Sequence, residues 1–333
     1  MPEAYIIDAV RTPRGIGKVG KGSLAHLHPQ VLGATVLKAI KDRNNLKTDE
    51  VDDIIWGCAT QVDKQGADLG RMSALLAGYD VKASGVTLDR FCGSGITSVS
   101  FGAGQIMSGM EDLVVAGGTD MMSFTASLAD PTRLPLMDKD NPQLRELHPQ
   151  SNQGVCADAI ATIEGISREA TEELAVESQK RATRAIAEGV VDGSAAILMA
   201  SPEYAKKHGW RPRAKIVTAV NVGDCPTLML NAPVPAAKKA LQRAGLTKND
   251  IDVWEINEAF AVVAEKFIRD LDLPRDKVNI NGGAMALGHP IGATGSILIG
   301  TALDELERTG GKYALVTMCA AGGMAPAIII ERL

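Results

Sequence analysis

Short apolar runs alternate with longer amphipathic segments through the first third of the chain. The runs have the length and residue types of buried strands, whereas the amphipathic segments repeat apolar residues at helical spacing. The predicted strands cover residues 4–10, 52–60, 84–91 and 112–120. The predicted helices cover residues 28–46, 66–78 and 95–110. Such alternation is typical of an α/β protein in which helices cover a largely buried sheet.

The same pattern returns in the last third of the chain. Predicted helices cover residues 234–246, 258–273 and 292–310. Predicted strands cover residues 250–257 and 278–290, and two more lie around a glycine-rich turn within 312–333. We therefore expect a second layered region built like the first.

Two segments show the repetition most clearly. Residues 86–118 and 278–323 both run from a strand through a glycine-rich turn into a helix of small residues, and then into a strand that ends at a glycine-rich stretch. An internal duplication of this kind predicts two similar halves that face each other. Cys92 and His289 lie in the two equivalent turns, at strand ends where open α/β sheets build their sites.

The segment between the halves has a different character. It begins with a stretch rich in Pro, Asp, Asn and Met and continues with two amphipathic helices, which is more typical of a cap over a site than of a sheet. The sequence thus predicts an N-terminal half over 1–120 and 190–210, an inserted loop domain over 121–189, and a C-terminal half over 211–333.

Composition narrows the classes of function. The chain has 333 residues, a net charge of −5 and no basic stripe, so we expect no nucleic-acid partner. No apolar run approaches the length of a membrane span and the start lacks the pattern of a secretory leader, so we expect no membrane association and a cytoplasmic location. Five scattered cysteines without a CxxC or CxxH pair predict free thiols and no metal site.

Four short motifs place a reactive or polar side chain beside small residues at a predicted strand end. The motifs are RFCGSG with Cys92, INEAFA with Asn257 and Glu258, ALGHPIGATG with His289, and TMCAAGGM with Cys319. Each alone has an ordinary explanation, because a lone cysteine is usually buried filler and a glycine-rich turn is usually only a turn. Asn257 alone could be a helix N-cap.

Taken together, the four motifs predict covalent catalysis. The pKa of a cysteine falls at a helix N-terminus or beside a histidine, and Cys92 precedes a predicted helix. A pairing of Cys92 with His289 between the halves would give an activated nucleophile. The glycines would let a thioester carbonyl reach backbone N–H groups, as in an oxyanion hole. Cys319 adds a second group, expected to titrate near neutrality, for proton transfer at carbon.

These four motifs, in this order, resemble those of the thiolases, the acetyl-CoA C-acyltransferases. The resemblance also includes the opening IIDAVRTP, the run GISREATEELAVESQKRA, the DGSAA box, PVPAAKKAL and the closing strands, so it extends over nearly the whole chain. It implies a thiolase-like fold with layers in the order α-β-α-β-α. It also implies acyl transfer through a cysteine acyl-enzyme, either cleaving a 3-ketoacyl-CoA with CoA or condensing acetyl-CoA.

The resemblance implies a role for each matching residue. Cys92 would be the acylated nucleophile, and His289 would take its proton. Asn257 would hold a water that completes one oxyanion hole with His289, and Cys319 would move the α-proton. The backbone N–H groups of Cys92 and Ala321 would form the second oxyanion hole. The candidates for the acyl and CoA site are Gln153, Met229, Phe260 and Gly288.

The resemblance also implies acyl-CoA and coenzyme A as substrates, no resident cofactor, and a homodimer or homotetramer. A methionine lines the acyl site in relatives at the position of Met229, although an ordinary core methionine explains this residue equally well. Gln153-Gly154 stands where many biosynthetic members carry Met-Gly, which favours degradative or broad-range members.

The chain departs from the family pattern in two places. The usual Cys-x-Gly-Gly-Gly is here Cys319-Ala320-Ala321-Gly322-Gly323, which adds a methyl group near the acyl pocket but keeps the backbone N–H. Near Gly189 the chain passes almost directly into the DGSAA box, where the family has a longer segment over the CoA pantetheine. Either the protein lacks this cover or the printed sequence omits a stretch, and the clean return of the pattern at VDGSAA favours omission.

Two other functions remain open from the sequence. A condensing enzyme of the ketoacyl-synthase or hydroxymethylglutaryl-CoA-synthase kind shares the fold and the nucleophile but lacks a second catalytic cysteine, so Cys319 argues against it. A non-catalytic acyl-CoA-binding homologue would not need the intact set of four motifs. Acyl chain length and the physiological direction of the reaction do not follow from these motifs.

Overall fold

The computed structural model describes residues 2–15, 17, 19, 22–128, 136–187 and 194–333. Within these residues nine strands form one mixed sheet in the order β3-β2-β4-β5-β1-β6-β9-β8-β7. The strands are β1 (Tyr5–Arg11), β2 (Asp53–Gly57), β3 (Val86–Leu88), β4 (Leu113–Gly118), β5 (Ala195–Ala200), β6 (Ala214–Gly223), β7 (Val253–Ile256), β8 (Tyr313–Thr317) and β9 (Met324–Arg332). The α/β class predicted from the sequence is therefore confirmed.

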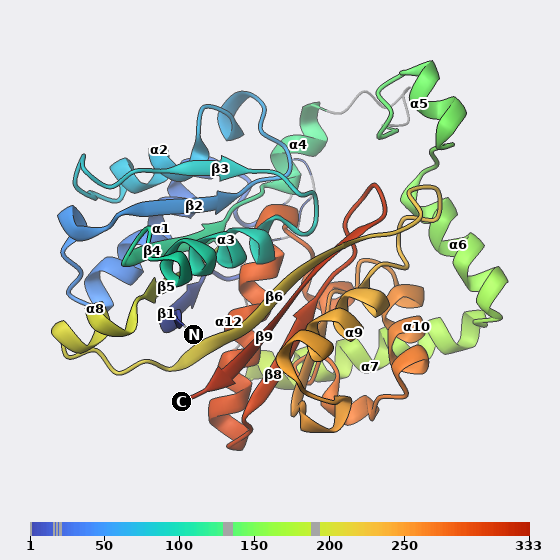
Figure 1. Ribbon diagram of the computed structural model, residues 1–333. Helices are drawn as coiled ribbons and strands as arrows, with labels where there is room; N and C mark the ends of the chain where they lie inside the picture. Colours follow the sequence, from blue (N-terminus) through green and yellow to red (C-terminus); the bar gives the residue numbers. More distant parts are fainter. Residues whose placement is uncertain (1, 16, 18, 20–21, 129–135, 188–193) are drawn as a thin grey trace.

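Helices cover both faces of this sheet (Figure 1). They are α1 (Pro29–Arg43), α2 (Leu69–Leu76), α3 (Ser94–Ser108), α4 (Met122–Leu128), α5 (Pro142–Leu147), α6 (Gln153–Glu164), α7 (Arg168–Ala187), α8 (Pro202–Lys207), α9 (Pro233–Ala244), α10 (Ala261–Leu271), α11 (Ala284–Leu287) and α12 (Ile291–Thr309). In the parts of the chain that are described, no helix is both long and apolar enough to cross a bilayer.

The sheet has two parts that meet where β1 pairs with β6. This antiparallel junction is short, with Tyr5 opposite Lys215 and Ile6 opposite Ala214. One hydrophobic cluster combines the inner faces of both parts with α3 and α12, which lie between them. A second cluster joins the outer face of the first part to α1, and a third joins the outer face of the second part to α9 and α10. The layers therefore follow the expected α-β-α-β-α order.

The two parts repeat each other at the level of single residues. Asp52 ties the start of β2 to the start of β4 by accepting two backbone N–H groups, and Asp252 ties β7 to β8 in the same way. Gly95 in the first turn of α3 corresponds to Gly295 in the first turns of α12. The members of both pairs are separated by the same number of residues, so the duplication predicted from the sequence is present in the structure.

The central helices cross where their glycines meet. A Cβ atom on Gly95 would lie 2.7 Å from the amide nitrogen of Ser296, and one on Gly295 would lie 2.7 Å from the carbonyl carbon of Gly95. Only residues without side chains allow the two backbones to approach so closely. This crossing brings the N-terminal ends of α3 and α12 together, and the turns of Cys92 and His289 precede these ends.

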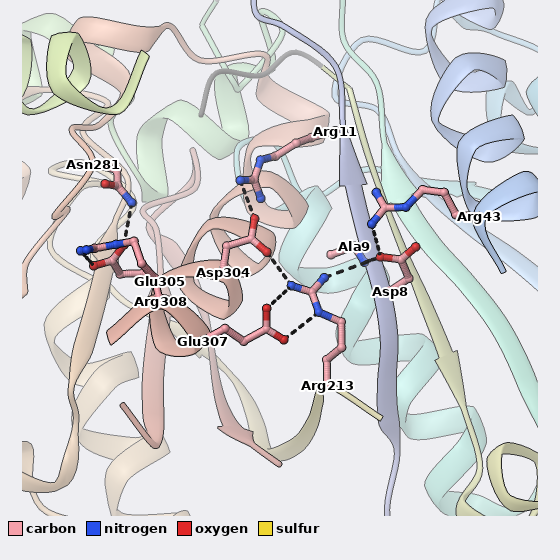
Figure 2. Close-up of polar contacts among 10 residues, drawn as sticks. All are labelled: Asp8, Ala9, Arg11, Arg43, Arg213, Asn281, Asp304, Glu305, Glu307 and Arg308. Atoms are coloured by element: carbon pink, nitrogen blue, oxygen red, sulfur yellow. Dashed lines mark hydrogen bonds and ion pairs between the residues drawn. The ribbon is translucent and has the colours of Figure 1, made fainter. Parts of the chain in front are cut away.

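An ion-pair network fastens α12 to the junction of β1 and β6 (Figure 2). Arg213, which directly precedes β6, donates to both carboxylate oxygens of Glu307 at 2.9 and 2.6 Å and to Asp304 at 2.6 Å. Arg11 of β1 pairs with the other oxygen of Asp304 at 2.7 Å. Arg213 also lies 3.6 Å from the buried carboxylate of Asp8. Charges from three elements thus fix one end of α12.

Two predictions of secondary structure need correction. Residues 278–290 form no strand; Val278 makes only an isolated bridge with Trp254, and the chain then turns and enters α11. Positive φ angles at Asn279 (48°), Gly282 (79°) and Gly288 (88°) are incompatible with a continuous strand. The strand β6 was not expected, because its side chains alternate only weakly between buried and exposed positions. The two helices predicted in the inserted segment are present as α6 and α7.

Candidate active site

The turn before Cys92 is held by local hydrogen bonds. The backbone N–H of Phe91 donates to Asp89 at 2.6 Å, and the hydroxyl of Ser94 donates to the carbonyl of Phe91 at 2.7 Å while accepting from the N–H of Arg90 at 2.9 Å. Phe91 has a φ of 49°, a left-handed conformation that costs about 1–3 kcal/mol for such a residue. This turn ends the strand-like segment and places Cys92 just before the N-terminal end of α3.

The thiol of Cys92 is buried and protonated at rest. Only 6% of the residue is exposed, and this burial raises its pKa to about 12, with the carboxylates of Asp120 and Asp89 adding to the rise. The sequence predicts the opposite direction, because Cys92 precedes a helix. Loss of hydration outweighs the helix N-terminus here. A nucleophilic role for Cys92 would therefore require a base that removes its proton.

His289 has the properties of such a base. Its Nδ1 lies 2.7 Å from the hydroxyl of Thr294, which itself donates to the carbonyl of Pro290 at 2.8 Å, so Nδ1 carries the hydrogen. The lone pair of Nε2 then faces the side-chain amide of Asn257 at 3.3 Å. Burial, with a smaller contribution from the positive charge of Arg14, lowers the pKa of His289 to about 4. The imidazole is therefore neutral near pH 7.

Asn257 lies directly after β7 and is 1% exposed. Its backbone N–H donates to the carbonyl of Thr317, and its Nδ2 reaches His289. It does not cap a helix, since the N-cap of α10 is Phe260. The Oδ1 atom of Asn257 is buried without a partner among the described residues. A buried amide oxygen costs free energy unless it accepts a hydrogen bond, so this atom is suited to a bound water or substrate group.

Cys319 follows β8 and begins the turn 319–323. Ala320 pairs with Met324 across this turn, and the φ angles of Gly322 (79°) and Gly323 (76°) are positive. Ala321 has no positive φ, so its methyl group is compatible with the backbone there. Cys319 is 1% exposed; its burial and the nearby thiol of Cys92 raise its pKa above the ordinary range. The expectation that Cys319 titrates near neutrality is wrong for the free enzyme.

The candidates for the acyl site occupy different surroundings. Met229 is 1% exposed and belongs to the same hydrophobic cluster as Cys319 and Ala321, and Phe260 packs against that cluster. Gln153 begins α6, is partly exposed and lies outside the cluster.

Gly288 lies next to His289, and its carbonyl accepts from Arg14 at 2.7 Å. It lines a cavity of about 600 Å³ that reaches His289 from the side of the N-terminal loop. Its apolar lining includes Leu24, Leu32, Met121, Met122, Met285 and Leu287. Cys92 and Cys319 do not line this cavity, so the cavity approaches the base and not the two thiols.

Several residues around the site are not evident from the motifs. Glu258 is 5% exposed and accepts from Ser178 of α7 at 2.6 Å and from Asn279 at 2.9 Å, as well as from the N–H of Met285 at 3.3 Å. It thereby ties the inserted helix α7 to the segment that leads to His289. Its place beside Asn257 in INEAFA is the only signal in the sequence. Thr294 likewise lies within the motif ALGHPIGATG, whereas Asp120 belongs to none of the four motifs. In the described part of the chain no group of three or more His, Cys, Asp or Glu side chains could hold a metal ion.

Comparisons with known proteins agree with this architecture. Residues 4–198 match the thiolase N-terminal domain, and residues 210–332 match the thiolase C-terminal domain. The chain belongs to the thiolase family, whose members are acyl-CoA acyltransferases. It is 38% identical to a steroid 3-ketoacyl-CoA thiolase of Mycobacterium tuberculosis, over 100% of this chain and 95% of that protein.

Two further relatives are thiolases as well. A beta-ketoadipyl-CoA thiolase of Acinetobacter baylyi is 35% identical, with all of both chains covered. A 3-ketoacyl-CoA thiolase of Bacillus subtilis is 32% identical, over 99% of this chain and all of that protein. The alignment with the Mycobacterium tuberculosis protein spans 389 positions, whereas this chain has 333 residues, so that protein contains residues without a counterpart here. From the sequence we expect the missing residues near Gly189, which lies outside the described residues.

Proposed function

We propose that this chain is a thiolase that cleaves a 3-ketoacyl-CoA with coenzyme A, or runs the reverse condensation, with Cys92, His289, Asn257 and Cys319 as its catalytic residues. The observation that carries the proposal is the pair of contacts that orient the buried imidazole of His289. Thr294 fixes its tautomer, and Asn257 faces its basic nitrogen. The reaction uses coenzyme A as a substrate and needs no resident cofactor.

In the first half-reaction the sulfur of Cys92 attacks the 3-keto carbon of the substrate. The thiol proton passes to Nε2 of His289, so no free thiolate has to form in a site that disfavours it. The bond between C2 and C3 breaks, and its electron pair remains on C2 as the enolate of acetyl-CoA. Cys319 gives its proton to C2, which leaves an acyl group on Cys92, a thiolate on Cys319 and a protonated His289.

In the second half-reaction coenzyme A restores the enzyme. The Cys319 thiolate takes the proton of the CoA thiol, and the CoA sulfur attacks the acyl group on Cys92. The sulfur of Cys92 leaves and recovers its proton from His289. The raised pKa of both buried cysteines supports this scheme, because each thiolate is then strongly basic and readily takes a proton back.

Two oxyanion holes would assist these steps. The unpartnered Oδ1 of Asn257 supports a bound water that, with His289, would stabilise the enolate oxygen of acetyl-CoA. The N–H groups of Cys92 and Ala321 donate to no backbone carbonyl among the described residues, which leaves them available to the thioester oxygen of the acyl-enzyme. The packing of Met229 and Phe260 near Cys319 and Ala321 supports an acyl pocket on that side.

The test is a CoA-dependent thiolysis assay with acetoacetyl-CoA and with a long-chain 3-ketoacyl-CoA. We expect turnover of at least one of them, with release of acetyl-CoA. Absence of turnover with both substrates, together with tight binding of acyl-CoA, would instead support a non-catalytic acyl-CoA-binding protein.

We further propose that the chain forms homodimers through the edge of its sheet at β3. Among the described strands β3 pairs with β2 alone, so its outer edge presents backbone groups that no other described strand pairs. The exposed side chains Val86 (45%), Phe101 (49%) and Met110 (67%) lie on β3 and on α3 and its C-terminal end. Val86→Asp should convert a dimer to a monomer in size-exclusion chromatography with light scattering, whereas Val81→Asp, at an exposed position off this strand, should not.

A further inference from the structure

Asp120 is a buried carboxylate that follows β4 and has no part in the proposed reaction. It is 5% exposed. Its Oδ2 accepts from the backbone N–H groups of Ala59 at 2.8 Å and Gly292 at 2.7 Å, and its Oδ1 accepts from the side-chain amide of Gln65 at 2.9 Å and from the thiol of Cys58 at 3.8 Å. These partners are all donors and stabilise the carboxylate, whereas burial raises the pKa of Asp120. It joins the ends of β2 and β4 to the first turn of α12.

The N–H group of Gly292 is the counterpart of the N–H group of Cys92. Both lie three residues before the paired glycines Gly95 and Gly295, although Gly292 is already within α12 whereas Cys92 precedes α3. In the turn of Cys92 this N–H faces the proposed site of the thioester oxygen. In the turn of Gly292 the carboxylate of Asp120 already occupies the equivalent place. The duplicated fold thus has one turn open to substrate and one filled by its own side chain.

The surroundings of Gly292 leave no room for a side chain at this position. A Cβ atom on Gly292 would lie 2.6 Å from the carbonyl oxygen of Gly57 and 2.8 Å from the carboxylate of Asp120. His289 lies three residues earlier in the same turn, and its orientation depends on Thr294 in the same helix. A fixed anion at the N-terminus of α12 also interacts favourably with the helix dipole.

We propose that Asp120 is a positioning residue for the thiolase reaction: its carboxylate fills the counterpart of the oxyanion hole at Gly292 and thereby holds His289 in line with Cys92. This inference rests on the proposed function. It predicts that loss of the carboxylate slows the chemical step without weakening the binding of coenzyme A, because Asp120 borders the cavity beside His289 but its carboxylate oxygens are taken by donors of the protein itself.

Asp120→Asn is a sharp test because the neighbours cannot adapt to an amide. The N–H₂ group of an asparagine would face either two backbone N–H groups or the amide of Gln65. Gln65 cannot reverse its own amide, since its oxygen accepts from Met121 at 2.6 Å and its nitrogen donates to Thr60 at 2.9 Å. One donor must therefore oppose another, and the turn of His289 has to shift.

The experiment compares wild type, Asp120→Asn, Asp120→Glu and the control Asp252→Asn. Asp252 also accepts two backbone N–H groups, but at the opposite end of β7 from Asn257. A displacement of about 1 Å in a catalytic group costs about 100-fold in rate. We expect kcat of Asp120→Asn to fall about 100-fold with KM for CoA within about threefold, and Asp252→Asn to keep its kcat. Asp120→Glu retains the charge, so its kcat should be at least about tenfold higher than that of Asp120→Asn. This variant remains informative if the asparagine variant does not fold.

A second readout does not depend on turnover. The negative charge of Asp120 disfavours the thiolate of Cys92, so its removal should raise the rate of Cys92 alkylation by iodoacetamide at pH 8 while thiolysis falls. A role in folding alone would lower the Tm without this opposite change. The proposal is overturned if folded Asp120→Asn keeps kcat within about threefold of wild type. If wild type shows no thiolysis, the proposed function fails, whereas the alkylation result still reports the electrostatic effect of Asp120 on Cys92.

Discussion

Gly295→Ala should separate the two central helices and thereby damage the site at their ends. The new Cβ atom would lie 2.7 Å from the carbonyl carbon of Gly95 and would also clash with the amide nitrogen of Ile96. Non-bonded carbon atoms pack at about 3.5–4.0 Å, so the helices must move apart by about 1 Å. Overpacking of this kind costs about 1–3 kcal/mol, which the better helix propensity of alanine offsets by only about 0.5–1 kcal/mol.

The same displacement should affect catalysis more than stability. Cys92 and His289 stand at the N-terminal ends of these helices, and a displacement of about 1 Å costs about 100-fold in rate. We therefore expect Gly295→Ala to lower kcat of thiolysis about 100-fold and the free energy of unfolding by about 1–2 kcal/mol. Urea denaturation and steady-state kinetics on the same preparations measure both quantities.

Gly104→Ala is the matched control on α3. No atom lies within 4 Å of a Cβ built at Gly104, so alanine should stabilise the helix by about 0.5–1 kcal/mol and leave kcat unchanged. The two substitutions add the same methyl group and are predicted to change stability in opposite directions. If Gly295→Ala proves as stable and active as wild type, the close crossing does not determine the geometry of the site.

Three further predictions concern the cysteines and the ion-pair network. Intact-mass spectrometry should show that Cys92→Ser takes no acetyl group from acetyl-CoA, whereas Cys319→Ser accumulates the acetyl-enzyme. The rates of condensation and thiolysis by Cys319→Ser should fall by about 10²–10⁴. A Cys319→Ser protein that folds but stays unacetylated would contradict this division of roles. The substitution Cys225→Ser removes the exposed thiol. In this background the alkylation rate of Cys92 should rise about tenfold per pH unit up to pH 10, because burial raises the pKa of Cys92 to about 12. A plateau of the rate below pH 9 would refute the raised pKa. Arg213→Ala should lower the free energy of unfolding by about 1–3 kcal/mol, because Asp304 and Glu307 lose a charged donor (Figure 2) but are partly exposed to water. High salt should reduce the difference in stability from wild type. Equal stability of the two proteins in low salt would show that the network contributes nothing.

The sequence alone was sufficient for the α/β class, the duplication and the four site motifs. Apolar periodicity is a local property that survives in any arrangement of the helices and strands, so α1, α3, α9 and α12 were predicted near their observed positions. The glycine-rich turns were equally readable, because positive φ angles at residues such as Gly322 require glycine. Strand β6 and the absence of a strand after Val278 could not be predicted, because the conformation of these segments depends on partners distant in the sequence.

The chemistry of the site depended on the tertiary structure. The sequence predicts a low pKa for Cys92 from its place before a helix, yet burial between the two halves raises that pKa to about 12. The pKa of His289 falls to about 4 for the same reason, which makes the histidine a neutral base. Desolvation is set by everything that packs around a group, most of it far away along the chain, so no local motif reports it.

Asp120 illustrates the same limit most clearly. In the sequence it is one acidic residue after a strand, followed by Met121 and Met122. Only the folded chain brings it to the N–H of Gly292, at the place that corresponds to the oxyanion hole proposed at Cys92. The sequence by itself determined which side chains are available for acyl transfer; the crossing of α3 and α12 decided which of them meet, because that contact joins residues that no local periodicity connects.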